Sequence, residues 1–276
     1  GHFVAHEMLA PSVLASLLID SVMGSEHVGE ELTVRMAGEM RVRGAPAVRL
    51  DGFSSGDSGS LVDAAMDLRG RLRRVFEQPF EKIRPEGVEM DVRVTQRRDE
   101  ARIESVTLWP RQARAGEKVR AEVRVRRRWG GEERREFEFT VPEEARPGES
   151  LRVEADDERS LLARDRGERS GGDSDIPSIL FGGRREEGPG ARSLGELIEG
   201  MNRQGRANVM MLRVTRSQEG VRDGRGRQDD VPASVASVLR NGPSEVEMIG
   251  DSVVAELRQE TEGEVSGSAV ARLLVQ

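Results

Sequence analysis

Apolar and polar residues alternate most regularly in the middle of the chain. Apolar side chains occupy every second position over residues 88–94, 119–125 and 137–141, and most of the residues between them are charged. A period of two places one face of a strand in a hydrophobic core and the other face in water. Glycine-containing turns separate these runs. The pattern predicts a small antiparallel β domain over residues 87–155.

Helical periodicity marks two segments before this region. A run that begins at Pro11 has apolar residues at 13, 14, 17, 18 and 22, with the proline in the first turn, where its missing N–H is harmless. A second run extends from Ser60 to Phe76 and ends before Pro79. Residues 31–50 between them predict two strands, with a break at Gly44-Ala45-Pro46. We therefore expect a mixed α+β segment over residues 1–86.

The pattern changes again after residue 155. Residues 156–192 are rich in Asp, Glu, Arg, Gly and Ser, with an apolar island at 176–181, and predict a mostly disordered polar linker. A capping box formed by Ser193 and Glu196 then predicts the start of a helix.

The rest of the chain predicts a second α+β segment, over residues 193–276. Residues 209–214 form a continuous apolar run typical of a buried strand, residues 231–239 favour a helix, and 246–275 favour two or three closing strands. The predicted fold class is α+β and β-rich. Its centre is an immunoglobulin-like antiparallel sandwich without the usual cysteine pair, flanked by mixed helix and strand segments.

The composition excludes several kinds of site and partner. The 276 residues contain no cysteine, which excludes disulfides, thiolate metal sites and a cysteine nucleophile. The formal net charge of -7 argues against a nucleic acid partner, because the arginines are balanced by acidic residues. The best apolar stretch, residues 8–23, is too short for a bilayer and contains Pro11 and Asp20, so we expect no membrane span in this chain.

One short motif resembles a catalytic loop. Gly56-Asp57-Ser58-Gly59-Ser60 is similar to the nucleophile loop of trypsin-like serine peptidases, and that resemblance makes Ser58 the candidate nucleophile, with His6 or His27 as its base. Those enzymes place their histidine about 140 residues before the serine, in a separate barrel, whereas both histidines here lie close to Ser58. The alternative hypothesis is structural: Ser60, with Asp63 three residues later, caps the helix that follows.

Metal and cofactor motifs are incomplete. His2 and His6 are four residues apart and Glu7 follows, but the zinc-peptidase pattern needs a histidine at position 10, which is Ala10. The glycines at 224 and 226 do not form a phosphate-binding fingerprint. The sequence therefore predicts neither a bound metal nor a cofactor. Trp109 and Trp129 are the two tryptophans available to a glycan- or peptide-binding surface.

The order of these elements resembles a known arrangement. The resemblance is carried by Pro79-Phe80, Gly116-Glu117, Thr140-Val141-Pro142, a segment from Ser193 to Arg203, and Val231-Pro232-Ala233-Ser234-Val235. Together they resemble the region downstream of the peptidase domain in large exported bacterial proteins similar to the sporulation stage IV B serine peptidase. The resemblance implies an exported location, periplasmic or at the cell surface, and a catalytic domain upstream of Gly1, whose histidine and serine correspond to no residue here.

The resulting functional hypothesis is a non-catalytic interaction or scaffolding region, accessory to an upstream serine-peptidase domain. Its partners would be other domains of the same protein or another protein. A serine hydrolase that uses Ser58 and a glycan- or peptide-binding β-sandwich are the two alternatives.

Overall fold

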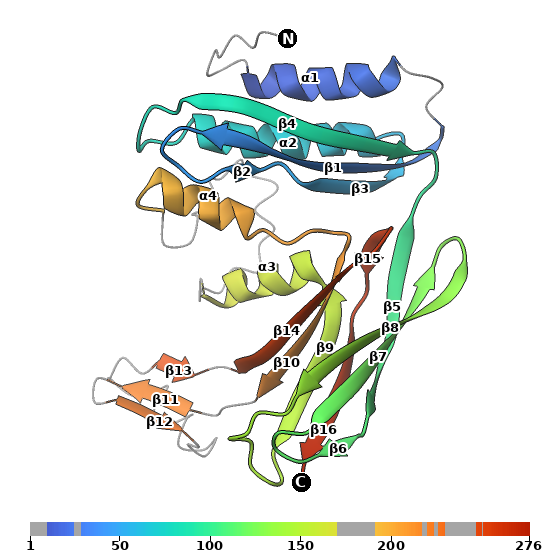
Figure 1. The fold of residues 1–276 in the computed structure, drawn as a ribbon, viewed down its shortest axis with the longest axis vertical. Helices are drawn as coiled ribbons and strands as arrows, with labels where there is room; N and C mark the ends of the chain where they lie inside the picture. The colour runs from blue at the N-terminus through green and yellow to red at the C-terminus, as the bar shows by residue number, and fades with distance from the viewer. Residues whose placement is uncertain are drawn as a thin grey trace.

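The computed structural model describes residues 10–24, 29–169, 191–216, 220–223, 226–229, 247–249 and 251–276. The architecture is α+β and rich in strands, as the sequence predicted. Figure 1 shows two layers, a helix-covered sheet at the top and a pair of facing sheets below it. We call them the helix-covered layer and the two-sheet layer.

The helix-covered layer is built around one long strand. That strand, β1, pairs antiparallel with β4 on one edge and with both β2 and β3 on the other. The elements of this layer are α1 (Ala10–Met23), β1 (Glu31–Val42), β2 (Val48–Arg49), β3 (Gly52–Asp57), α2 (Ser60–Phe76), β4 (Pro85–Thr95) and α4 (Leu194–Asn202).

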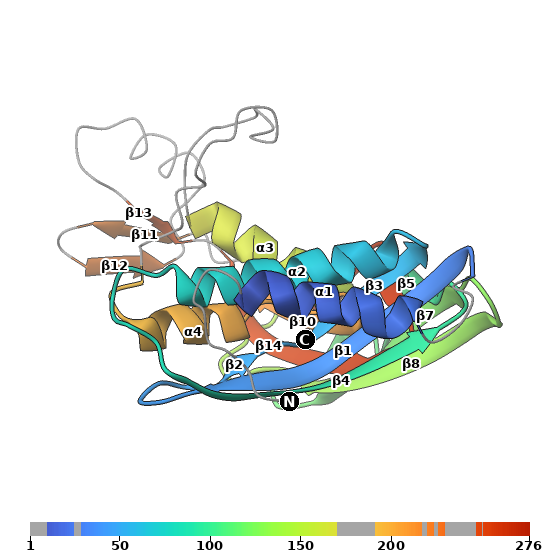
Figure 2. The same cartoon turned by 90° about the horizontal axis from the view of Figure 1, so that it is seen from above.

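Helix and strand faces match the apolar periodicity. Leu32, Val34 and Met36 of β1 are buried toward the helices, and α2 buries Leu68 and Leu72 against them. Seen from above, α1 and α2 lie side by side (Figure 2). The bounds of α2 are those that the sequence predicted. The α4 helix joins the same core although it lies far along the chain, and its predicted cap is confirmed because the Ser193 side chain accepts a hydrogen bond from the Glu196 amide.

The predicted face of α1 is only partly correct. Ala15 and Leu18 are buried, but Val13 is 45% exposed and Leu17 is 50% exposed. The helix is apolar on most sides, so the sequence does not determine which side packs against the sheet.

The two-sheet layer has one core between two sheets. The strand orders are β14-β10-β9-β16-β6 and β15-β5-β7-β8, and buried residues of both sheets form one hydrophobic cluster. The strands are β5 (Glu100–Trp109), β6 (Gln112–Ala113), β7 (Lys118–Arg127), β8 (Gly131–Thr140), β9 (Ser150–Asp157), β10 (Val209–Arg216), β14 (Ser252–Glu260), β15 (Glu264–Ser266) and β16 (Ala269–Val275).

The β region over residues 87–155 does not pair as one unit. Its first strand, β4, pairs with β1, with Val92 opposite Met36. Its last strand, β9, lies between β10 and β16, which come from the C-terminal segment. The predicted domain boundaries at 87 and 155 are therefore displaced. The physical reason is that alternation specifies the buried face of a strand and not its neighbour in the sheet.

The predicted linker over residues 156–192 begins as ordered structure. Strand β9 continues to Asp157, and the helix α3 (Glu158–Arg169) follows directly. The polar composition misled the prediction, because the acidic residues here are bound by arginines from distant strands. Residues 170–190 lie outside the described part of the chain.

A further three-stranded sheet, β12-β11-β13, follows β10. Its strands are β11 (Gly220–Asp223), β12 (Gly226–Asp229) and β13 (Glu247–Ile249). The strand prediction for 209–214 is confirmed by β10, whereas the predicted helix over 231–239 lies outside the described residues. The closing region has four strands, β13 to β16, instead of two or three.

Candidate functional site

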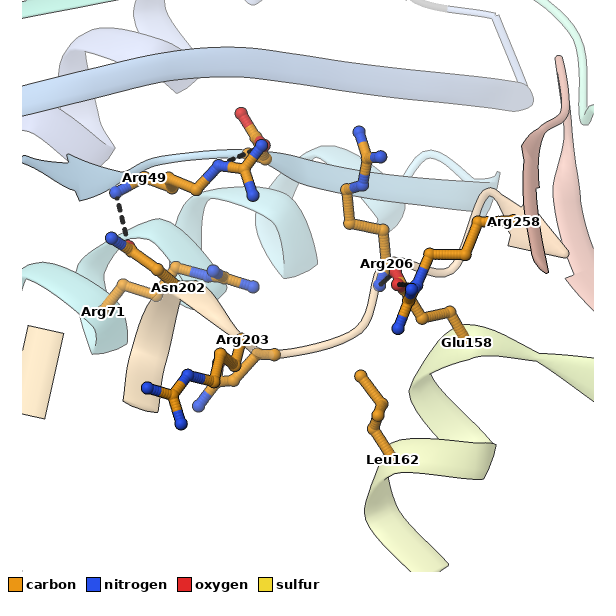
Figure 3. Close-up of a pocket in the computed structure, with 10 residues that line it drawn as sticks. Arg49, Arg71, Glu158, Leu162, Asn202, Arg203, Arg206 and Arg258 are labelled. Carbon is orange, nitrogen blue, oxygen red and sulfur yellow. Dashed lines mark hydrogen bonds and ion pairs between the residues drawn. The ribbon is translucent and has the colours of Figure 1, made fainter. Parts of the chain in front are cut away.

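A pocket with a volume of about 360 Å³ opens where the two layers meet. That volume is within the range of small-ligand sites. Figure 3 shows side chains from β2, α2, α3, α4 and β14 that approach it from several sides. We call it the arginine pocket, and the residues that line it are Arg49, Asp51, Arg71, Glu158, Leu162, Asn202, Arg203, Gln204, Arg206 and Arg258.

Asn202 fixes the wall that the helix-covered layer contributes. Its side-chain amide donates to the Ala47 carbonyl at 2.8 Å and accepts from the Arg49 amide at 2.8 Å, so the end of α4 is bound to β2. Arg71 reaches the same wall from α2. Its Nε contacts Asp67 at 3.0 Å, and its side chain is only 15% exposed. The Asn202 contacts hold α4 against β2, whereas the pair within α2 orients the Arg71 side chain.

The segment between α4 and β10 forms the floor. The Arg206 amide donates to Glu158 Oε2 at 3.0 Å. Gly205 permits this approach, because a Cβ atom there would lie 2.6 Å from the backbone nitrogen of Arg159 and 2.6 Å from the carbonyl carbon of Glu158. The backbone of the segment between α4 and β10 therefore packs directly against the start of α3.

Both carboxylates of the pocket are already bound. Glu158 Oε1 accepts from Arg258 Nε at 2.7 Å while its other oxygen accepts from the Arg206 amide. Asp51 Oδ2 lies 3.6 Å from Arg49 Nε, and its Oδ1 accepts from the Gly38 amide at 3.4 Å. Both carboxylates of the lining are therefore engaged by groups of the protein itself.

The lining carries an excess of positive charge, with five arginines and two carboxylates. Arginines 71, 203 and 206 also pair with acids outside the lining, each through one side-chain nitrogen. A guanidinium has five N–H donors, so further donors remain for a ligand. Among the described residues that line the pocket there is no serine, threonine, cysteine, histidine, lysine or tyrosine. Such a site can bind an oxyanion through its guanidinium groups.

A second group of charged residues fixes α3 to the outer face of the β14-β10-β9 sheet. Arg213, with a side chain only 8% exposed, contacts both oxygens of Asp165 at 2.6 and 2.8 Å and Glu256 at 2.8 Å. Arg164 pairs with Glu154 at 2.6 Å and with Asp156. We call these six residues the α3 network.

Asp156 is a member of the α3 network with a raised pKa. Burial raises its pKa from the usual value near 3.8 to about 6. The Asp157 amide and the Arg164 guanidinium both act in the opposite direction, because they favour the charged carboxylate. Desolvation outweighs them at this position, where only 7% of the residue is exposed.

The candidate nucleophile lies away from the arginine pocket lining. Ser58 is exposed in the turn between β3 and α2. The predicted cap is wrong in detail, because Gly59 is the N-cap residue of α2 and no side chain caps the helix. Instead, Asp57 Oδ1 accepts from the Gly59 amide at 2.8 Å. His6 and His27 lie outside the described residues, so their hypothesised role stays a prediction.

The remaining sequence candidates are distributed over the surface. Trp109 and Trp129 are 52% and 57% exposed and lie near opposite ends of β7, and the Arg128 guanidinium is 5.8 Å from the centre of the Trp129 ring. Within the described residues, no group of three or more His, Asp or Glu side chains is arranged to hold a metal ion. His2 and His6 lie outside that part of the chain.

Sequence reasoning missed the arginine pocket altogether. Its lining comes from separate segments between residues 49 and 258, and arginine is too frequent in this chain for any one of them to be distinctive.

Among the helices that the structure describes, none has the length and apolar character needed to cross a membrane. Comparison with protein-family models, curated proteins and solved structures finds no match for this chain.

Proposed function

We propose that this chain is a non-catalytic interaction module that holds an anionic group of its partner in the arginine pocket. The observation that carries the proposal is the convergence of five arginines around a cavity whose two carboxylates are already bound. Guanidinium groups match the planar geometry of carboxylate and phosphate oxygens. The oxyanion is thus a carboxylate or phosphate on another domain of the same protein or on another protein.

The position of the pocket supports a scaffolding role. Arg49 and Arg71 belong to the helix-covered layer, whereas Arg258 belongs to the two-sheet layer. An anion that contacts both groups would link the layers and stabilise their contact, because a ligand that binds only the folded state raises the free energy of unfolding.

Two broader features belong to the same proposal. The immunoglobulin-like assignment of the two-sheet layer is supported by two mainly antiparallel sheets around one core. The exported location and the peptidase partner are supported by the resemblance of the element order alone. The reading frame that precedes Gly1 tests the latter: an upstream signal peptide and peptidase domain are expected, and a frame without them would contradict the peptidase context.

Thermal unfolding with two probes tests the binding role. Pyrophosphate and triglutamate are titrated separately, at ionic strength matched with sodium chloride. We expect at least one probe to raise the unfolding midpoint progressively, by the amount corresponding to about 2.7 kcal/mol at a hundred times its Kd. Equal midpoints in both probes and in sodium chloride would contradict the proposal.

Fluorophosphonate labelling tests the non-catalytic part. A serine hydrolase would label stoichiometrically at Ser58 and lose the label in Ser58→Ala. We expect no stoichiometric label on the wild-type chain.

A further inference from the structure

The outer edge of β4 has no paired strand among the described residues. This strand of 11 residues pairs with β1 alone, and Figure 1 shows it along the upper edge of the helix-covered sheet. An unpaired edge presents a row of backbone N–H and C=O groups to any strand that approaches, so its protection or its use needs an explanation.

The edge strand β8 of the other layer shows what protection looks like in this chain. Its inward-facing positions include the half-buried ion pair of Glu133 and Arg135, at 2.6 Å. The Gln259 side chain also donates to the Glu136 carbonyl at 2.6 Å. Inward-pointing charges and a covered backbone are both devices that block strand addition.

Among the described residues, β4 has neither an inward-pointing charge nor a covered backbone, and its charged side chains lie on the solvent-facing side. The side chains on its helix-facing side are all apolar over residues 88–94, where Met90 and Val92 are half-buried and Val88 and Val94 are each 37% exposed. A neighbouring strand with apolar residues opposite these positions would cover them. The edge therefore favours addition of a strand that carries apolar residues on the helix-facing side of the sheet.

The charged side of β4 indicates what such a strand would carry. Arg93 stands opposite Arg35 of β1, and Glu89 stands opposite Glu39. Like charges in directly opposed positions are unfavourable. Glu39 has Arg49 opposite it on the other side of β1. Arg93 has an exposed ion pair with Asp91 of its own strand, at 3.5 Å, but within the described residues no strand on the outer side of β4 places an opposite charge beside it.

We propose that β4 pairs antiparallel with an extended segment of a partner protein that places an acidic residue opposite Arg93, a basic residue opposite Glu89 and apolar residues between them. This contact is separate from the arginine pocket and does not depend on it. Main-chain hydrogen bonds supply the affinity, and the alternating side chains supply the specificity.

Two labelled peptides of identical composition test the proposal by fluorescence anisotropy on the full chain. Thr-Val-Glu-Val-Lys-Val-Lys-Val is complementary to residues 95 down to 88, whereas Thr-Val-Lys-Val-Lys-Val-Glu-Val reverses the charges opposite Arg93 and Glu89. We expect the first to bind about fivefold more tightly, from two cross-strand charge pairs. Equal affinities, or no binding of either peptide, would overturn the proposal.

The double variant Glu89→Lys/Arg93→Glu supplies the matched control. It replaces two like-charge pairs with opposite charges against β1, so we expect it to fold, and it should reverse the peptide preference. An unchanged preference would overturn the proposal. Arg71→Gln should leave both affinities unchanged, which separates a failure here from a failure of the pocket.

A second copy of the chain is the alternative occupant. Because the protein has no cysteine, a Val92→Cys variant forms a disulfide dimer only between two introduced thiols. We expect the complementary peptide to suppress that dimer. A dimer that forms equally well in its presence would overturn the proposal in favour of self-association.

Discussion

Two groups of arginines contact α3, and they differ in the acids with which they pair. In the α3 network, two arginines share four carboxylates. In the arginine pocket, five arginines share two lining carboxylates, both already bound. Arg258 touches both groups, since it pairs with Glu158 and Glu256. The acids differ in burial: Glu154 and Asp156 of the α3 network are largely buried, whereas Arg71, Arg203 and Arg206 of the pocket pair outside the lining with exposed acids. The arginines of the network therefore hold the fold, and the remaining donors of the pocket arginines are available to a ligand.

Removal of Arg213 should have the largest effect on stability. Arg213→Met removes the buried cation that joins Asp165 to Glu256, and Glu256 keeps only Arg258 as an ion-pair partner among the described residues. We expect the free energy of unfolding in urea to fall by about 3–5 kcal/mol. The added changes Asp165→Asn and Glu256→Gln should restore part of that loss. A loss below about 1 kcal/mol would contradict a structural role for the α3 network.

The pH dependence of Asp156 should be the next largest effect. Its folded pKa, about 6, lies above the unfolded value, so the folded state binds more protons between about pH 4 and pH 6. The contribution of Asp156 to stability therefore improves as the pH falls through that window. Relative to wild type, Asp156→Asn should be more favourable at pH 7.5 than at pH 4, by up to about 3 kcal/mol.

Urea unfolding of both proteins across this pH range measures the difference. Asp156→Asn also changes the contact with Arg164, which adds a constant offset, so the slope with pH carries the prediction. Parallel curves for the two proteins would show that Asp156 does not titrate in this window.

Gly205→Ala tests the close contact between the backbone at Gly205 and the start of α3. The added Cβ would lie 2.6 Å from the backbone of Glu158 and Arg159, and backbone cannot move aside as a flexible side chain can. We expect a loss of about 1–3 kcal/mol in the free energy of unfolding. Gly200→Ala is the control, because a Cβ there meets no atom within 4 Å. Equal stabilities of the two variants would show that the start of α3 tolerates displacement.

Arg71→Gln and Arg73→Gln should have the smallest effects on stability. Both arginines lie on α2 and pair with an acid four residues away, Arg71 with Asp67 and Arg73 with Glu77. Each change should cost about 0.3–0.5 kcal/mol in urea unfolding. Only Arg71 lines the pocket. A large loss in the free energy of unfolding for Arg71→Gln would show that Arg71 stabilises the fold, as the arginines of the α3 network do.

The sequence predicted strands and helices well where one face is apolar. The alternation at Val119–Val125 became β7, and the helical run at Ser60–Phe76 became α2 with the same ends. It missed β3, where Phe53 is the only buried residue in Gly52–Asp57. Alternation specifies a buried face, but it does not name the neighbouring strand. That is why β4 was assigned to the wrong sheet.

The helix α3 and the arginine pocket could not be predicted for a related reason. The charged residues of α3 have the composition of a linker. They are ordered because Arg213 and Arg258, from strands about 50 and 100 residues away, bind Asp165 and Glu158. The pocket likewise combines arginines from separate segments of an arginine-rich chain. Both features depend on long-range ion pairs, and no local pattern records them.

The most direct test is calorimetric titration with whichever probe, pyrophosphate or triglutamate, stabilises the protein. Four proteins are compared: wild type, Arg71→Gln, Arg206→Gln and Arg73→Gln. We predict one site per chain, at least about tenfold weaker binding for Arg71→Gln and Arg206→Gln, each of which removes a charge-assisted contact, and unchanged binding for Arg73→Gln. Equal affinities of Arg71→Gln and Arg73→Gln would contradict the proposal that the arginine pocket is an anion site.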